Sequence, residues 1–232
     1  MTSLEGLSVL VVGATGGLGA PISRRLADAG AALTLVARDA DRIAALGLDG
    51  TAVAGDLRDP ETAQRAVDAA VRAHGRLDGV VVASGIVAFG PAADLPDAVL
   101  LDLFTINALG PIRILQAAAP HLTASAEQGR SPFVVNLSAV VAEQPTAGMA
   151  AYSASKAALT AFDAAAGREL RRAGIRVIDA RPPHTETGLA GRPAAGEAPR
   201  LPVGLDPDAV AARIVAAIVD GDKDLPSSAF AE

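Results

Sequence analysis

Short apolar runs alternate along the chain with longer stretches in which polar residues return to one side of a helix. The runs are rich in Val and Leu, which is typical of strands buried on both faces of a parallel sheet. The predicted strands cover residues 7–12, 32–37, 51–54, 80–83, 133–137 and 176–180. The predicted helices cover residues 20–29, 40–46, 60–74, 96–120, 149–172 and 208–219.

Capping and breaking residues mark the ends of several elements. Asp59 is expected to cap the third helix and Gly75 to end it, and Asp206 to cap the last helix. Gly110-Pro111 predicts a kink or break within the long fourth helix. The segment 188–204 is rich in Gly, Pro and Ala and is expected to form a mobile loop.

Repeated strand-then-helix units predict a parallel sheet with right-handed crossovers. The fold class that follows is α/β: a doubly wound parallel sheet (Rossmann fold) with three layers, α/β/α. Neither an internal repeat nor a linker divides the sequence, so we expect one domain over residues 1–232.

Composition and charge narrow the possible functions. The chain has 20 Lys and Arg against 26 Asp and Glu and a formal charge of −6, which disfavours nucleic-acid or anionic-membrane partners. The absence of cysteine excludes disulfides and thiolate chemistry, and three scattered histidines make a metal site a poor hypothesis. The longest uncharged stretch, 79–93, is too short to span a bilayer, and the N-terminus does not resemble a signal peptide. We therefore expect a cytoplasmic protein without a membrane segment.

A glycine-rich turn follows the first predicted strand and opens the first predicted helix. Glycines at this point let the backbone turn tightly and approach a pyrophosphate on the positive end of the helix. A turn that merely needs a positive φ is the alternative, but the strand before and the helix after it favour dinucleotide binding. The residues of this turn that we expect to hold the dinucleotide are Gly13, Thr15, Gly16, Gly17, Leu18 and Gly19.

The end of the second predicted strand bears on which dinucleotide binds. An acidic residue here would bind a ribose 2′-hydroxyl, whereas an arginine suits a 2′-phosphate. The chain has Ala37 and then Arg38, so NADP(H) is favoured over NAD(H). The alternative is a surface Arg38 paired with Asp39 or Asp41. Asp56, after the third strand, could accept from the adenine amine or cap a turn.

Tyr152, the only tyrosine in the chain, precedes Lys156 by four residues, so both project from one face of a helix. A lysine ammonium beside a phenol favours the phenolate and lowers a pKa that starts near 10. A tyrosine in this setting can act as a general acid or base. Taken alone, the spacing is common and usually marks a surface pair; its position after the fifth strand of a dinucleotide fold favours chemistry.

Several motifs together resemble those of the classical short-chain dehydrogenase/reductase family. The resemblance runs from residue 7 to about residue 219 and rests on the glycine pattern, on Asp56, on the segment 104–107 and on the segments 152–158 and 182–187. It implies an oxidoreductase that moves a hydride between nicotinamide and a carbonyl or alcohol carbon. Tyr152 would exchange the proton, Lys156 would lower its pKa and hold the nicotinamide ribose, and Asn107 would hold a water. Further implied cofactor-binding residues are Leu57, Ala83, Gly85, Pro182, Thr185 and Thr187.

The chain departs from the family pattern where a catalytic serine is expected. Counting back from Tyr152 places Ala139 at that position, and Ser138 is one residue away. In an extended strand Ser138 would face the other side, although a twist or bulge could still let it serve as the catalytic serine. Without either hydroxyl the substrate oxygen lacks a donor, which typically costs about 10²–10³ in rate. A catalytically weak or inactive NADP(H)-binding sensor or scaffold is therefore the alternative function.

Two smaller departures concern backbone segments. The family usually has two asparagines before an Ala-Gly pair after the fourth strand, whereas this chain has Val82-Ala83-Ser84-Gly85. Pro183 replaces the glycine that follows Pro182, which predicts a stiffer loop. A sugar-nucleotide epimerase is a distant third hypothesis, since it calls for another glycine spacing and a larger C-terminal region.

The remaining expectations concern the pocket and the partners. Asp163 and Glu169 are predicted to lie on solvated faces or to pair with Arg168 and Arg172. His184 is expected to face solvent, with a place in the lining of the substrate pocket as the alternative. The substrate loop at about 188–204 is short and the pocket apolar, which suggests a small or flat hydrophobic carbonyl or alcohol. A homodimer or homotetramer formed through the helices that bear Asn107 and Tyr152 is expected from the resemblance. The residues predicted to wall the pocket are Ile86 to Phe89, Val140, Val141, Met149 and Leu189.

Overall fold

The computed structural model describes residues 2–230 and contains one six-stranded parallel sheet. The strand order is β3-β2-β1-β4-β5-β6. The first three strands are added outward from β1 on one side of the sheet, and the last three are added outward from β4 on the other side. This doubly wound arrangement confirms the predicted fold class. The strands are β1 (Ser8–Val12), β2 (Ala32–Ala37), β3 (Thr51–Ala54), β4 (Gly79–Val82), β5 (Phe133–Leu137) and β6 (Arg176–Ala180).

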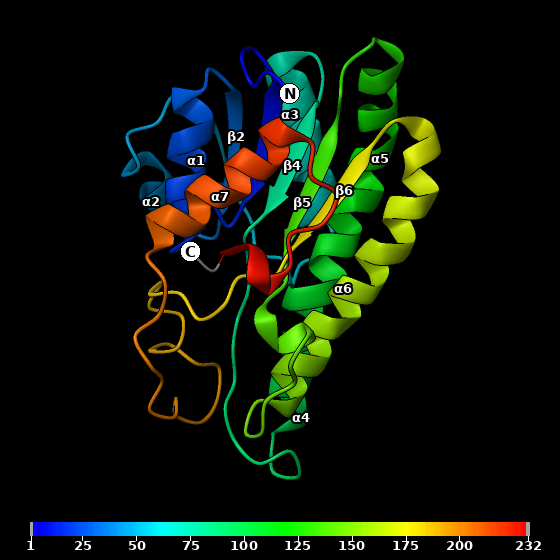
Figure 1. Ribbon diagram of the computed structural model, residues 1–232. Coiled ribbons are helices and arrows are strands. Elements are labelled where there is room, and N and C mark those ends of the chain that lie inside the picture. The colour runs from blue at the N-terminus through cyan, green and yellow to red at the C-terminus, as the bar shows by residue number, and fades with distance from the viewer. Residues whose placement is uncertain (1, 231–232) are drawn as a thin grey trace.

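Helices cover both faces of the sheet (Figure 1). Side chains of α1 and α7 pack on one face, and side chains of α3, α5 and α6 pack on the other. The helices are α1 (Gly19–Asp28), α2 (Ala40–Ala44), α3 (Thr62–His74), α4 (Asp97–Phe104), α5 (Gly110–Glu127), α6 (Ala150–Leu170) and α7 (Pro207–Asp220). Shorter helical turns are η1 (Thr105–Leu109), η2 (Val140–Ala142), η3 (Arg171–Ala173) and η4 (Ser227–Phe230).

The two apolar layers come from the alternation of side chains along each strand. In β1, Val9 and Val11 join the layer beneath α1 and α7, whereas Leu10 and Val12 join the layer beneath α3 and α5. Every residue of β1 is buried, as expected for a central parallel strand. The sheet is thereby a rigid platform, and its carboxyl edge carries the loops described below.

The long fourth helix is interrupted one turn before the predicted point. Residues Thr105–Leu109 form a π-helical turn, and Gly110 and Pro111 begin α5. Pro111 has no N–H to donate to the carbonyl of Asn107, so a regular α-helical bond is lost there. π-turns inside helices often mark functional positions, and this one carries Asn107.

The continuous helical stretch Asp97–Glu127 is long and apolar enough to cross a membrane, judged by length and composition alone. A core helix passes the same test, and Ile114, Ala118 and Leu122 of α5 are fully buried against the sheet. We therefore interpret the stretch as a core helix whose other side is apolar and exposed at Leu101 and Leu109.

The predicted helix ends are partly confirmed. Asp206 caps α7 by accepting from the amide of Asp208, and Gly75 ends α3 in the left-handed conformation. Asp59 does not cap α3, which begins later, at Thr62. Its carboxylate accepts from the amide of Glu61 instead. Residues 188–204 contain neither helix nor strand, as expected.

Candidate active site

The glycine turn lies at the carboxyl edge of the sheet and is packed too tightly for side chains. A Cβ at Gly13 would stand 2.6 Å from the hydroxyl of Ser84, and one at Gly17 would collide with Thr187. Within residues 2–230, the backbone amides of Gly17 and Leu18 donate to no other group. α1 begins at Gly19, and its first turn contains no acidic side chain. The turn therefore offers free donors at the positive end of a helix, which fits a pyrophosphate.

Two arginines stand near this turn at the end of β2. Arg38 is exposed and forms no ion pair with the described residues, so the predicted alternative pairing with Asp39 or Asp41 is not seen. Arg42, on α2, donates to the backbone carbonyl of Thr15 at 3.3 Å. Sequence reasoning missed Arg42; its position in the first turn of the short helix that follows the second strand was the available signal.

Asp56 lies after β3, but its carboxylate is already engaged. It accepts from the amide of Arg58 at 2.9 Å and forms an ion pair with the Arg58 guanidinium at 3.1 Å. Arg58 also bridges to Asp102 on α4 at 2.9 Å. Leu57 is buried against Gly110. The segment 56–58 thus links the expected adenine side of the cleft to α4, which continues into the π-turn that carries Asn107.

Lys156 is held deep in the site by the strand beneath it. It is 4% exposed, and its Nζ donates to the carbonyl of Leu137 at 2.7 Å. Burial lowers the pKa of Lys156 to about 8, although Asp179 and Asp163 act in the opposite direction. Lys156 is therefore poised to gain or lose a proton near neutral pH.

Tyr152 lies one helical turn before Lys156, inside an apolar cluster. Burial raises the pKa of Tyr152 to about 12. No side chain among residues 2–230 forms a hydrogen bond with its hydroxyl. The predicted lowering of the phenol pKa by Lys156 is therefore not seen here, because burial acts in the opposite direction.

Asn107, in the π-turn, forms hydrogen bonds to two other segments of the site: the chain after β4 and helix α6. Its side chain accepts from the amide of Ile86 and donates to the carbonyl of Ile86, each at 2.9 Å, and donates to the Ser155 hydroxyl at 3.0 Å. A Cβ on Gly85 would stand 3.3 Å from Nζ of Lys156 and 3.4 Å from Oδ1 of Asn107. Gly85 therefore lets the chain after β4 approach these two polar groups. Ala83 is half-buried beside it.

Ser138 and Ala139 point to different sides at the end of β5. The Ser138 hydroxyl is buried and accepts from Thr160 on α6 at 3.2 Å. Ala139 is extended, with φ −172° and ψ 164°, and packs in the apolar cluster that contains Tyr152. The hydrogen bond to Thr160 and the burial of Ser138 argue against a role as the catalytic serine, and that assignment stays a prediction. The methyl group of Ala139 lies in the Tyr152 cluster instead.

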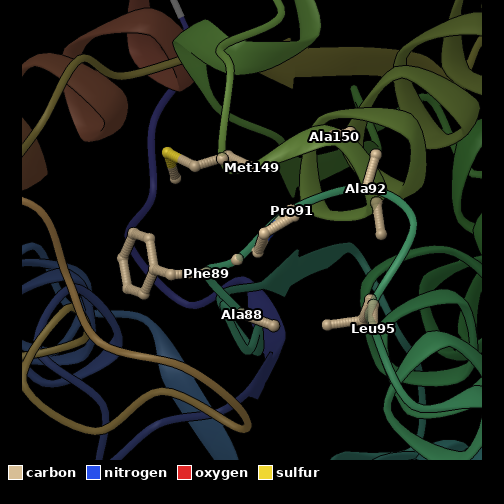
Figure 2. A pocket seen from close by; sticks show the side chains of 10 residues that line it. Ala88, Phe89, Pro91, Ala92, Leu95, Met149 and Ala150 are labelled. Carbon is tan, nitrogen blue, oxygen red and sulfur yellow. The ribbon is translucent and has the colours of Figure 1, made fainter.

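Apolar side chains surround Tyr152 on the substrate side. The predicted pocket residues Val87, Phe89 and Val141 are buried here, with Met149 and Leu189 packed against them. Figure 2 shows Phe89 and Met149 projecting to the same side of a small hollow, opposite Ala92 and Leu95. The backbone of the 188–204 loop covers this region through hydrogen bonds of Phe89 to Ala195 and of Ala194 to Val87, at 2.9 and 2.8 Å.

The segment after β6 connects the pocket with the glycine turn. Pro182 accepts from the amide of Val140 at 3.1 Å, and the Thr185 hydroxyl donates to the carbonyl of Pro183 at 2.9 Å. Thr187 lies against Gly17. His184 is not simply solvent-facing: it lines a cavity of about 340 Å³ under the 188–204 loop, 3.5 Å from Glu186.

The burial of Asp163 is the clearest difference from the sequence prediction. This residue was predicted on a solvated face, but it is 3% exposed and accepts from the Asn136 amide at 2.7 Å. Burial raises the pKa of Asp163 to about 8, and neighbouring Asp179 adds to the rise. Tyr152, Lys156 and Asp163 share one face of α6, and this spacing was a signal in the sequence.

We expect Asp163→Asn to stabilise the folded protein at neutral and alkaline pH. An Asp with a raised folded-state pKa keeps its proton up to about pH 8, whereas the unfolded chain releases it near pH 4. The stability that it contributes is complete below pH 4 and is lost as pH rises toward 8. The unfolding free energy of the variant should exceed that of the wild type by about 2–4 kcal/mol above pH 8. Urea unfolding between pH 5 and 9 measures this, and a gap that does not grow with pH contradicts it.

Within the described residues 2–230, no group of three or more His, Cys, Asp or Glu side chains could hold a metal ion. A parallel sheet with a glycine turn at its carboxyl edge, and a Tyr and Lys pair beyond β5, defines a dinucleotide-type oxidoreductase site. The family model of short chain dehydrogenases matches residues 8–197. The chain belongs to the short-chain dehydrogenase family and is an oxidoreductase.

Similar proteins have known sequences and structures. An ipsdienol dehydrogenase from Ips pini is 29% identical over 201 residues, which cover 83% of this chain and 79% of the relative. A 3-ketoacyl-(acyl-carrier-protein) reductase from Brucella melitensis, complexed with NADH, has a TM-score of 0.85 at 23% identity, covering 98% and 100% of the two chains. A short chain dehydrogenase from Burkholderia cenocepacia, in complex with NADP, has a TM-score of 0.83 at 23% identity, covering 98% and 90%. These two structures share the fold.

Proposed function

We propose that this protein is an NADP(H)-dependent oxidoreductase that interconverts a carbonyl and an alcohol, with Tyr152 as the general acid and base. The observation that carries the proposal is the convergence of Tyr152, Lys156 and Asn107 beside the glycine turn. The family relationship and the relative named ipsdienol dehydrogenase support the same chemistry.

A bound nicotinamide supplies the hydride for reduction or accepts it in oxidation. The amides of Gly17 and Leu18 would hold its pyrophosphate, and Thr187 would close over it. In the reductive direction the Tyr152 hydroxyl would give its proton to the carbonyl oxygen of the substrate. In the oxidative direction Tyr152 takes that proton back. Lys156 stabilises the phenolate form, and Asn107 would hold a water that connects the lysine to solvent.

The preference for NADP(H) rests on positive charge at the end of β2. At position 37 the chain has Ala rather than an acidic residue, so no carboxylate there repels a 2′-phosphate. Arg38 is exposed and forms no ion pair among residues 2–230. Arg42 adds a second guanidinium fixed against Thr15. Two guanidinium groups can each donate charge-assisted hydrogen bonds to one phosphate.

We expect Arg38→Ala and Arg42→Ala each to weaken NADPH binding about tenfold or more while NADH binding changes little. Isothermal titration calorimetry with both cofactors measures the two dissociation constants. Arg72→Ala, an exposed arginine on α3, is the matched control. Equal weakening for both cofactors would contradict an interaction with the 2′-phosphate.

The substrate that suits the pocket is a small or flat hydrophobic carbonyl or alcohol. Apolar side chains such as Phe89, Val141 and Met149 line the space beside Tyr152, and such a lining selects by shape and apolar contact. The loop over this space would move aside for the substrate to enter. NADPH oxidation against a panel of carbonyl compounds, compared with the Tyr152→Phe variant, tests the proposal.

The second candidate function is a weak or inactive NADP(H) sensor or scaffold, and Ala139 is the observation that favours it. Tight NADPH binding without Tyr152-dependent turnover would support the sensor over the enzyme. For the oligomeric state, we propose a homodimer or homotetramer through the apolar exposed side of α4 and η1, at Leu101 and Leu109. We also propose a cytoplasmic location.

A further inference from the structure

A cluster of buried polar side chains lies beside Lys156, whose Nζ donates to the carbonyl of Leu137, the residue after Asn136. Asn136 of β5 and Asp179 of β6 are neighbours in register on the face of the sheet that α6 covers. Asp163 of α6 reaches the amide of Asn136 at 2.7 Å. All three side chains are at least nine-tenths buried. Two carboxyl groups and an amide are thus enclosed where a parallel sheet normally buries apolar side chains.

Three oxygen atoms of this cluster lack a hydrogen-bond donor. Within the described part of the chain, Oδ1 of Asn136, Oδ2 of Asp163 and Oδ1 of Asp179 are buried and have no partner. A buried acceptor without a donor is costly, and two ionised carboxyl groups would also repel each other. A proton on one carboxyl group removes the repulsion and supplies one missing donor.

Charged groups face this cluster from two elements. Lys156 comes from α6 and Arg181 from the segment after β6, and both act on Asp163 together with Asp179. Arg181 is bound to Oδ2 of Asp179 at 2.6 Å and to Glu143 and Asp224, so the carboxylate of Asp179 is already paired with a guanidinium. Among residues 2–230, the Asp163 carboxyl group has only the neutral side-chain amide of Asn136 as a hydrogen-bond partner. Asp163 is therefore the carboxyl group that carries the proton.

We propose that Asp163, together with Asp179, is a positioning pair for Lys156 that keeps the lysine ammonium charged as the solution becomes alkaline. Near neutral pH, Asp179 alone supplies the negative charge and Asp163 is neutral. When base removes the proton of Asp163, the new carboxylate attracts the ammonium and retains its proton. The step is a single ionisation, with the proton leaving to solvent hydroxide and no other reactant. The inference rests on the proposed function only for its effect on turnover.

The number of lysines makes the ionisation of Lys156 directly measurable. Lys156 and Lys223 are the only lysines in the chain. Protein labelled with ¹⁵N or ¹³C at the lysine side chain gives two signals by NMR, and Lys223→Arg assigns them. We expect Asp163→Asn to move the titration midpoint of Lys156 downward by about one pH unit. We expect Asp179→Asn to move it downward by at least as much.

The Lys223 signal is the internal control, since Lys223 lies outside the cluster, and the measurement needs neither cofactor nor substrate. An unchanged Lys156 midpoint in both folded variants overturns the proposal, even if their melting temperatures change. Asp179→Asn provides the second variant should Asp163→Asn fail to fold. This result is independent of whether the protein proves to be a reductase.

The consequence for turnover is a change of pH profile. In Asp163→Asn nothing replaces the carboxylate that forms in the wild type above pH 8, so Lys156 loses its proton at lower pH. We expect the ratio of kcat/KM at pH 9 to that at pH 6 to fall at least threefold relative to the wild type. A profile lowered evenly at all pH values would mean a structural role only and would contradict the inference.

Discussion

Replacement of Tyr152 by Phe should lower kcat/KM for carbonyl reduction by about 10³-fold, within the range expected for loss of a general acid. The expected loss is chemical rather than structural, because the Tyr152 hydroxyl has no hydrogen-bond partner in the described chain and the ring lies in an apolar cluster. We therefore also expect the melting temperature and the dissociation constant of NADPH to stay close to those of the wild type. A steady-state assay of NADPH oxidation, with calorimetry for cofactor binding, separates the two effects.

The same residue provides an optical readout that does not depend on turnover. The chain has one tyrosine and no tryptophan, so the ultraviolet absorbance of phenolate reports Tyr152 alone. In the ligand-free protein we expect this signal to rise near pH 12, because burial raises the pKa. With NADP⁺ bound we expect the midpoint to fall by two units or more, as a positive charge nearby favours phenolate. An unchanged midpoint, together with unchanged kcat/KM in Tyr152→Phe, would exclude Tyr152 as the acid.

The strands along the chain, the doubly wound fold class and the position of the glycine turn follow from patterns that are local in the sequence. Uncharged runs such as 133–137 predict buried strands to the residue, since strands covered on both faces have no polar side. The glycine turn and the Tyr152 and Lys156 spacing carry information about chemistry because both sit at fixed places relative to those strands. Helix ends were predicted less well: the side chain of Asp59 serves the turn before α3 rather than the helix itself.

What the sequence did not disclose depends on contacts between distant elements. Asp163 looks like an ordinary helix-surface residue unless the register of β5 and β6 beneath it is known, because burial comes from Asn136 and Asp179. The π-turn at Asn107 likewise needs the packing of α4 and α5 to be seen. The high pKa of Tyr152 arises because the 188–204 loop and the pocket side chains close around it, and no pattern in the sequence encodes that closure.

Restoring a serine at position 139 should raise activity, which is the reverse of what most active-site substitutions do. Ala139 is extended and packs beside Tyr152, so Ala139→Ser adds a hydroxyl on the side where the substrate oxygen would bind. One added donor to the oxygen is worth up to about 10²–10³ in rate, and we expect a gain of about tenfold to a hundredfold in kcat/KM. Initial rates of NADPH oxidation for the two proteins, with the same carbonyl panel, measure the gain.

Ser138→Ala is the matched control for this gain. Its hydroxyl is held by Thr160 on the other side of the strand, so its loss should leave kcat/KM within about twofold of the wild type. A tenfold fall in Ser138→Ala would mean that the strand end rearranges and that Ser138 is the donor after all. If Ala139→Ser brings no gain over an active wild type, another group already donates to the substrate oxygen. If the wild type has no measurable turnover and the Ala139→Ser variant is active, the protein is instead a cofactor-binding protein. It would then lack ordinary reductase activity because residue 139 has no hydroxyl group.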